Sequence, residues 1–292
     1  CITGVICFLG ILFKKNKLVF FLQSIWLILF IGLNSGGMDW QNNFNTFHYM
    51  SMANIKSEGF FMVFYNYLAV IFKECGLDYY IFNFILSTMS TMLILYTIRK
   101  FSKYPNIVVS LLYIYPLMDF VIQKRWYYAT GIIVFGLAVY KQEKNKWFRI
   151  IKFGLCCLIA CQFHAAAAFF VLVIVFEFIP EKYQRRAIVL AFICILGSVR
   201  FLPQFLAMLG FGSIKITLYF VTFAKNATVM KFLFWATWQL SFLAGIYVTK
   251  NLCGSNEDEW IFIKKMNLIA LILIPFYVFD PVFVRIFRCV YV

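Results

Sequence analysis

One histidine stands inside the most apolar part of this sequence. The stretch IACQFHAAAAFFVLV contains His164, and the only other histidine of the chain is His48. An imidazole in hydrocarbon requires hydrogen-bond partners, and an ionised one is costly there. Imidazole also moves protons near neutral pH, and Ala165–Ala168 leave space beside it. His164 is therefore either a packed structural residue or, as we expect, a general base that lines a polar cavity.

Cationic side chains interrupt the apolar pattern at two further places. The stretch MDFVIQKRWYYATG contains Lys124 and Arg125, and the end of the chain contains Arg285 and Arg288. Arginine presents a planar fork of donors to phosphate and stays charged at any relevant pH. These four residues are candidates for an anion clamp. The alternative is a set of snorkelling cations in an aromatic belt and a basic anchor at the end of the chain.

A polar stretch, LNSGGMDWQNNFNTF, combines glycine, a carboxylate and aromatic rings. Gly37 allows the backbone to approach a ligand closely, and Asp39 can accept hydrogen bonds from sugar hydroxyls. The flat rings of Trp40 and Phe44 suit the faces of sugar rings. The alternative is an ordinary polar loop with a Gly-Gly turn and an interfacial tryptophan. We treat these residues as candidate acceptor contacts, with Asp39 as the second choice for the base.

The cysteines do not indicate a metal site. The nine cysteines are scattered, mostly within apolar runs, and no C-x-x-C is present. Cys157, Cys161 and His164 share one helical face, but a site of this kind needs three or four ligands and no fourth is evident. We therefore expect buried thiols that pack as small hydrophobic residues, with no metal and no cofactor.

The composition is that of a polytopic membrane protein. Hydrophobic residues make up 63% of the 292 residues and charged residues 13%, and the mean hydropathy is +0.84. A soluble domain of this composition could not cover its core. The net charge of +15 comes from short basic clusters between apolar runs. This pattern reports topology and contact with anionic lipid in the bilayer, and it does not indicate nucleic-acid binding.

The chain predicts an all-α bundle of apolar segments that forms one domain, residues 1–292. Because Cys1–Phe13 looks like the tail of a spanning helix, we expect further residues before it. The apolar segments are 1–13, 18–33, 79–98, 106–122, 126–140, 153–179, 187–202, 232–249 and 266–284.

Basic residues set the expected sidedness, because cytoplasmic loops are enriched in Lys and Arg. We expect residues 34–78 to form an outer loop plus an amphipathic helix at the interface, over 60–75. Residues 203–231 are expected to form a second outer loop. Most of the 27 Lys and Arg residues fall in the clusters placed in the cytoplasm: Lys14, Lys15, Lys17, Arg99, Lys100, Lys103, Lys141, Lys144, Lys146, Arg149, Lys152, Lys182, Arg185, Arg186, Lys250, Lys264 and Lys265.

The run 153–179 is flanked by basic clusters at both ends, so it must start and finish on the same side. It is too short for two full spanning helices at ~20 residues each. We expect a broken or re-entrant pair that turns near His164, since irregular backbone at membrane depth survives only where it lines a cavity or is buried in protein. The alternative is a single long tilted helix.

Four of these stretches, in order, resemble motifs of the EpsG-like family of Wzy-type polysaccharide polymerases. The family has a G-x-D-x-x-x-(Y/F) stretch in an early outer loop, an R-Q-x-x-A stretch that opens a middle helix, an F-H-x-(S/A)-A stretch and a late Arg-x-x-x-Tyr-like segment. Because the family usually continues into another helix, the resemblance also predicts residues beyond Val292. The matching residues are Gly37-Met38-Asp39 with Phe44, Arg125-Trp126-Tyr127-Tyr128-Ala129, Phe163-His164-Ala165-Ala166-Ala167, and Arg285 through Tyr291.

The resemblance implies a GT-C-like helical bundle that joins oligosaccharide repeat units carried on undecaprenyl diphosphate, at the outer face of a bacterial plasma membrane. Arg125 and Arg285, helped by Lys124 and Arg288, would stabilise the diphosphate leaving group without a metal. His164 would be the general base. The implied protein partners are a flippase and a chain-length regulator.

Two other classes of protein fit parts of the pattern. A flippase or transporter of an anionic lipid-linked substrate could bind phosphate through the arginines and relay protons through His164. A membrane-bound acyltransferase could use His164 as its base, although no second polar site for a thioester donor is visible. A flippase forms no new covalent bond, so covalently longer glycan separates it from a polymerase.

The topology predicts that Asp39, Arg125 and Arg285 face the exterior, whereas Lys144 and Lys264 face the cytoplasm. Single cysteines placed at these positions in a cysteine-free background should react accordingly with an impermeant reagent on intact cells. Labelling at position 144 together with protection at position 39 would show that the orientation is reversed.

Overall fold

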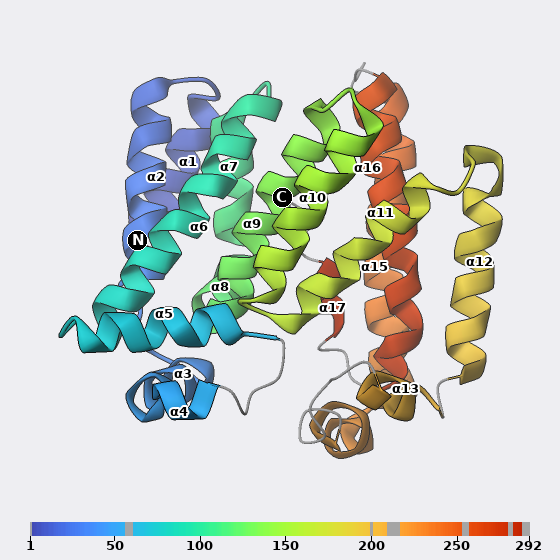
Figure 1. Ribbon diagram of the computed structural model, residues 1–292. Coiled ribbons are helices and arrows are strands. Elements are labelled where there is room, and N and C mark those ends of the chain that lie inside the picture. The colour runs from blue at the N-terminus through green and yellow to red at the C-terminus, as the bar shows by residue number, and fades with distance from the viewer. Residues whose placement is uncertain are drawn as a thin grey trace. The chain divides into compact units, whose positions relative to one another are not determined.

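The computed structural model describes residues 2–55, 61–198, 201–208, 217–252, 257–279 and 283–287. Throughout these ranges the regular elements are helices (Figure 1). The prediction of an all-α membrane protein is confirmed. The chain divides into two compact units, Cys1–Ala168 and Phe169–Tyr291. The single domain and the GT-C-like arrangement stay predictions.

In the first unit, α1, α2, α6 and α9 agree to within three residues with the apolar segments predicted at 1–13, 18–33, 79–98 and 126–140. The bounds of the helices in this unit are α1 Ile2–Leu12, α2 Lys17–Gly32, α3 Met38–Tyr49, α4 Met52–Ile55, α5 Val63–Glu74, α6 Tyr79–Phe101, α7 Pro105–Ile114, α8 Leu117–Ile122, α9 Lys124–Gln142 and α10 Lys146–Cys161. The 3-10 helix η1, Ala165–Phe170, follows α10.

The second unit contains the apolar helices α12, α15 and α16, together with several shorter helices. Their bounds are α11 Val171–Glu177, α12 Glu181–Ser198, α13 Leu202–Met208, η2 Leu218–Thr222, η3 Phe223–Asn226, α15 Val229–Leu252, α16 Glu257–Ala270, η4 Leu271–Val278 and α17 Val284–Phe287. Among the described residues of the whole chain, three helical stretches are long and apolar enough to cross a membrane: Tyr79–Phe101, Val229–Lys250 and Asp258–Val278.

The expected helix over 60–75 is present as α5, and in Figure 1 it runs across the ends of its neighbours in the first unit. The apolar segment 106–122 consists of two helices, α7 and α8, with Tyr115 and Pro116 between them. Proline disfavours helical backbone in the residue before it, which accounts for the end of α7. The outer loop expected over 203–231 contains α13, η2 and η3 where it is described.

The basic loops of the first unit meet at one end of its helices. The ammonium groups of Lys14, Lys15 and Lys103 all lie 5.3–5.7 Å from the centre of the Tyr104 ring. Lys100 Nζ donates to Gln142 Oε1 over 2.6 Å, so the clusters after α6 and α9 also lie together. This gathering supports the expectation that these clusters share one side of the membrane.

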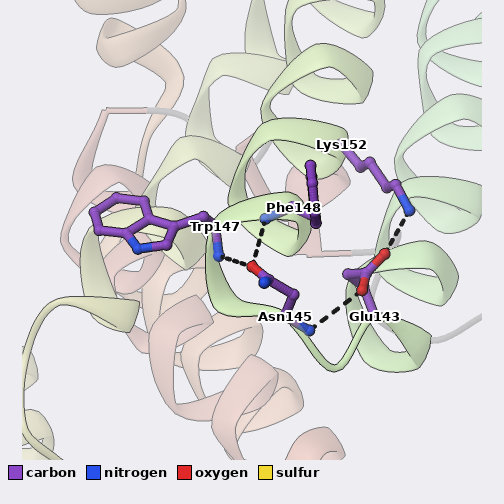
Figure 2. Close-up of polar contacts among 5 residues, drawn as sticks. All are labelled: Glu143, Asn145, Trp147, Phe148 and Lys152. Carbon is purple, nitrogen blue, oxygen red and sulfur yellow. Dashed lines mark hydrogen bonds and ion pairs between the residues drawn. The ribbon is translucent and has the colours of Figure 1, made fainter.

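The turn from α9 into α10 lies in the densest of these basic clusters (Figure 2). The side chain of Asn145 accepts hydrogen bonds from the backbone N–H groups of Trp147 and Phe148, at 2.9 and 3.2 Å. It thereby caps two donors that have no partner within the helix. Glu143 accepts from the Asn145 N–H and pairs with Lys152, which lowers the pKa of Glu143 below its ordinary value. These contacts fix where α10 begins.

Helices α6 and α9 pack at very close range around Gly131. A Cβ atom at this position would lie 2.3 Å from Ser90 Oγ and 2.8 Å from Ser90 Cα. Ser90 Oγ also donates to the Tyr127 carbonyl over 2.6 Å, in a buried contact. The small residue thus lets two backbones approach, as is common between helices in membranes.

We therefore expect Gly131→Ala to destabilise the fold by about 1–3 kcal/mol, because overpacking against backbone atoms outweighs the better helix propensity of alanine. The matched control is Gly245→Ala in α15, where a Cβ would meet nothing within 4 Å. That substitution should leave the stability unchanged or raise it by up to ~1 kcal/mol. Thermal unfolding of the purified proteins in detergent measures both, and equal midpoints would contradict the close packing.

Candidate functional site

The long apolar run 153–179, which begins within α10, is broken where the sequence predicted a turn. Helix α10 ends at Cys161, and η1 begins at Ala165. The backbone N–H groups of Phe163 and His164 both donate to the Ala160 carbonyl over 3.0 Å. The prediction of a broken helix is confirmed, and the alternative of one continuous long helix is wrong.

The imidazole of His164 takes part in the break. Its Nδ1 accepts a hydrogen bond from the Ala166 N–H over 3.2 Å. Its ring packs edge-on against Trp126 of α9, with ring centres 5.1 Å apart. In a neutral imidazole, one nitrogen accepts and the other carries the proton. This bond therefore assigns the proton of the neutral ring to Nε2.

Arg125 is the second residue of α9, and its guanidinium is held by uncharged groups. The guanidinium carbon lies 5.8 Å from the centre of the Tyr65 ring, and Nη1 donates to the sulfur of Met62 over 3.2 Å. In the described part of the chain, no carboxylate lies within ion-pair distance of Arg125. The fork is therefore positioned without being neutralised, as a phosphate-binding arginine requires.

Met62 holds this position in an unusual backbone conformation. Its φ angle is +68°, in the left-handed region, directly before α5 begins. For a residue other than glycine this conformation costs of order 1–3 kcal/mol and persists only when the surroundings fix it. The sulfur contact to Arg125 and the burial of the Met62 side chain are part of those surroundings.

Three elements of the first unit meet around Arg125 and His164. The ring of Phe163, at the break, lies 6.3 Å from Tyr65 of α5 and 6.2 Å from Tyr128 of α9. Gln162 Oε1 accepts from the Phe64 N–H over 3.2 Å, which ties the break to the first turn of α5. The start of α9, the start of α5 and the break therefore form one cluster, which we call the Arg125–His164 cluster.

Lys124 lies elsewhere, although the sequence grouped it with Arg125. Its side chain is completely buried, and Nζ donates to the backbone carbonyl of Ile31 near the end of α2. That carbonyl is among the last four of its helix and has no partner within it. Lys124 therefore ties α9 to α2, and its expected contact with substrate stays a prediction.

The early polar stretch forms the start of α3. Gly37 has a φ angle of +99° and precedes the helix, and Asp39 is in its first turn. The ring of Trp40 is buried, 5.1 Å from Phe44 and 5.6 Å from Tyr79. Its Nε1 has no hydrogen-bond partner among the described residues. Trp40 thus contributes mainly to packing, and Phe44 keeps a partly exposed ring.

Aromatic packing connects α3 to the Arg125–His164 cluster. Phe47 of α3 and Tyr65 of α5 both contact Phe82 of α6, with ring centres 5.3 and 5.4 Å apart. The acceptor candidates on α3 and the anion-binding candidate Arg125 are therefore joined through shared neighbours within one unit. The sequence did not single out Met62, Tyr65 or Phe82, since aromatic and sulfur side chains are common throughout an apolar chain.

Of the two late cationic candidates, the structure describes Arg285, which belongs to the second unit. Arg285 is in α17 and is partly buried. Arg288 lies outside the described residues.

The described residues contain no group of three or more His, Cys, Asp or Glu side chains that could hold a metal ion. Cys157 and Cys161, considered above with His164, are buried free thiols.

Comparison with known proteins gives one match over nearly the whole chain. The model of a family described as "EpsG family" matches residues 17–292. No curated protein and no solved structure matches the chain.

The positions of Lys124 and Arg125 predict unequal losses of stability for two neighbouring substitutions. Lys124→Ala should destabilise the fold by at least about 1–3 kcal/mol, because it leaves a buried carbonyl unsatisfied and removes packed methylenes. Arg125→Ala removes a partly exposed side chain and its contacts with Met62 and Tyr65, so it should lower the unfolding midpoint less than Lys124→Ala does. Thermal unfolding in detergent compares them, and a larger loss of stability in Arg125→Ala would contradict the assignment.

Proposed function

Since the chain belongs to the EpsG family, a Wzy-like family of polysaccharide polymerase type, we propose that it lengthens a polysaccharide by joining oligosaccharide units carried on undecaprenyl diphosphate. The donor is a growing glycan on the lipid diphosphate, and the acceptor is one lipid-linked repeat unit. The reaction takes place at the outer face of a bacterial plasma membrane. The family match and the apolar helices support a membrane protein with a polymerase-like function.

The reaction replaces one bond at the anomeric carbon by another. An acceptor hydroxyl oxygen attacks the anomeric carbon of the donor sugar, and the bond from that carbon to the diphosphate oxygen breaks. The electron pair of the broken bond goes to the diphosphate, and the hydroxyl proton passes to a base. Negative charge therefore develops on phosphate oxygens, and catalysis depends on groups placed to receive it.

Arg125 is the residue best placed for this task. Its guanidinium is fixed by Tyr65 and Met62, but no carboxylate of the described residues competes for it. Fixed donors that need no rearrangement during the reaction stabilise a developing charge most effectively. This uncompensated, positioned arginine is the observation that carries the proposal. The roles of Arg285 and Arg288 in binding phosphate stay predictions from the sequence.

The tautomer of His164 changes its proposed role. A general base acting through Nε2 must lack a proton there, but the Ala166 bond to Nδ1 assigns the proton to Nε2. We therefore propose that His164 donates from Nε2–H to the diphosphate, beside Arg125. Asp39, the second choice for the base in the sequence, then becomes the first. Gly37 and Phe44 on the same segment remain the proposed acceptor contacts, whereas the ring of Trp40, which the sequence grouped with them, is buried and packs against its neighbours.

The two other classes differ from this proposal in the bond that they form. A flippase of lipid-linked substrate would use the same arginine to bind phosphate but would make no covalent product. An acyltransferase would consume a thioester. Purified protein supplied only with lipid-linked repeat units should therefore yield a ladder of longer glycans, and the absence of a ladder from folded protein that binds the substrate would favour a flippase.

We expect Arg125→Lys to shorten the glycan ladder severely, with a loss of rate of order 10²-fold. Lysine keeps the charge but loses the two parallel donors of the guanidinium, and the loss of one donor to a developing oxyanion typically costs about 10²–10³-fold. The protein level and the unfolding midpoint are the controls and should be unchanged. Wild-type ladders would return Arg125 to a role in the aromatic belt.

A series at position 164 separates a donor from a base. The amide nitrogen of glutamine can replace an Nε2–H donor but cannot accept a proton at neutral pH. We expect His164→Gln to retain the rate within about tenfold, whereas His164→Ala should lose about 10²-fold or more. Rates of ladder formation in the same assay measure both. If His164→Gln is as slow as His164→Ala, the general-base role predicted from the sequence is correct instead.

A further inference from the structure

Two lysines of the second unit converge on one tryptophan. Lys250 is in the last turn of α15, and Lys264 is in α16. Their ammonium groups lie 4.3 and 4.1 Å from the centre of the Trp260 ring. Such cation–π contacts are favourable, but they bring two like charges close together.

Neighbouring groups fix the orientation of the Trp260 indole, and a third cation lies near the two lysines. Trp260 Nε1 donates to the Ile246 carbonyl over 2.9 Å, and the ring of Tyr247 meets the indole edge-on at 5.8 Å. Arg185 of α12 is near enough to repel the charge on Lys264, as Lys250 does. We call Lys250, Lys264, Arg185 and Trp260 the Trp260 cation cluster.

Neither lysine of this cluster forms an ion pair with a described carboxylate of the second unit. Glu181 attracts Lys264, but it forms no ion pair with it. Glu177 forms an ion pair with Lys265 instead, with 3.2 Å between Oε2 and Nζ. In the part of the chain that the structure describes, no carboxylate lies within ion-pair distance of Lys250 or Lys264. An anion bound here would relieve the repulsion among three cations.

The surroundings favour a lipid over a soluble anion. Lys250 ends one candidate membrane span, and Lys264 lies six residues inside another, Asp258–Val278, which is about 9 Å along the helix. This is the depth at which lysine side chains reach from the apolar layer to headgroups. Exposed apolar side chains lie beside the cluster on both helices, among them Val248 and Ile263. They would contact acyl chains while the cations contact phosphate.

We propose that the Trp260 cation cluster binds the headgroup phosphate of an anionic phospholipid. Lys250, Lys264 and Arg185 supply the charge, and Trp260 holds the two ammonium groups at the level of the headgroups. This site lies in the second unit and is independent of the polymerisation reaction.

Quenching of Trp260 by brominated acyl chains tests the proposal directly. The full-length protein is reconstituted in phosphatidylcholine vesicles that contain either brominated phosphatidylglycerol or brominated phosphatidylcholine. The contribution of Trp260 is the difference from the Trp260→Phe protein. We expect stronger quenching by phosphatidylglycerol in wild type, and a preference reduced about five-fold for each lysine removed in Lys250→Gln/Lys264→Gln.

Matched variants make the result specific. Lys225→Gln/Lys231→Gln removes two exposed lysines that lie just before and at the start of α15, and it should keep the preference, as should Lys250→Arg/Lys264→Arg. Equal quenching by the two lipids in wild type would overturn the proposal, whether or not the variants fold. An equal loss in the control variant would also overturn it. Abolition of the preference by excess inorganic phosphate would show that the site takes a free anion instead of a lipid.

Discussion

A helix that breaks inside an apolar layer leaves backbone donors and acceptors that lipid cannot satisfy. The first unit meets this constraint at residues 162–164. Ala160 accepts two backbone bonds, Gln162 accepts from the first turn of α5, and the imidazole of His164 accepts from Ala166. The bonds that make the break possible also attach it to α5 and set the tautomer of the histidine. The chemistry available at the break therefore follows from the way in which its backbone is satisfied.

The arginine beside the break is subject to a different constraint, which concerns its charge. An ion pair would position a guanidinium well, but it would also neutralise it and compete with a phosphate ligand. Here an aromatic face and a sulfur atom position Arg125, and both are uncharged. Lys124, the adjacent cation, instead satisfies a carbonyl at the end of α2. Of two neighbouring positive side chains, one therefore stabilises the fold and the other stays available for an anion.

The sequence predicted the features that depend on length and on the pattern of charge. The basic residues on both sides of 153–179, together with its length, predicted the break. The hydropathy placed α1, α2, α6, α9 and α15 to within three residues at each end. Tertiary detail could not be predicted in this way. A Lys-Arg pair does not reveal which member turns inward, because that depends on the unpaired carbonyl of Ile31. The tautomer of His164 depends on a bond from Ala166, and alanine carries no signal of it. Pro116 marks the interruption between α7 and α8 in the sequence, but the apolar residues on both sides of it read as one segment.

The most direct test of the account is the protonation of the His164 ring. The chain has two histidines, so a His48→Gln protein labelled with ¹⁵N-histidine gives a spectrum of His164 alone. We predict that the neutral ring carries its proton on Nε2, and that lipid-linked diphosphate substrate shifts the Nε2 resonance while leaving Nδ1 unprotonated. A proton on Nδ1, or an Nε2 resonance that the substrate does not change, would contradict the claim that the break orients His164 as a donor to the diphosphate.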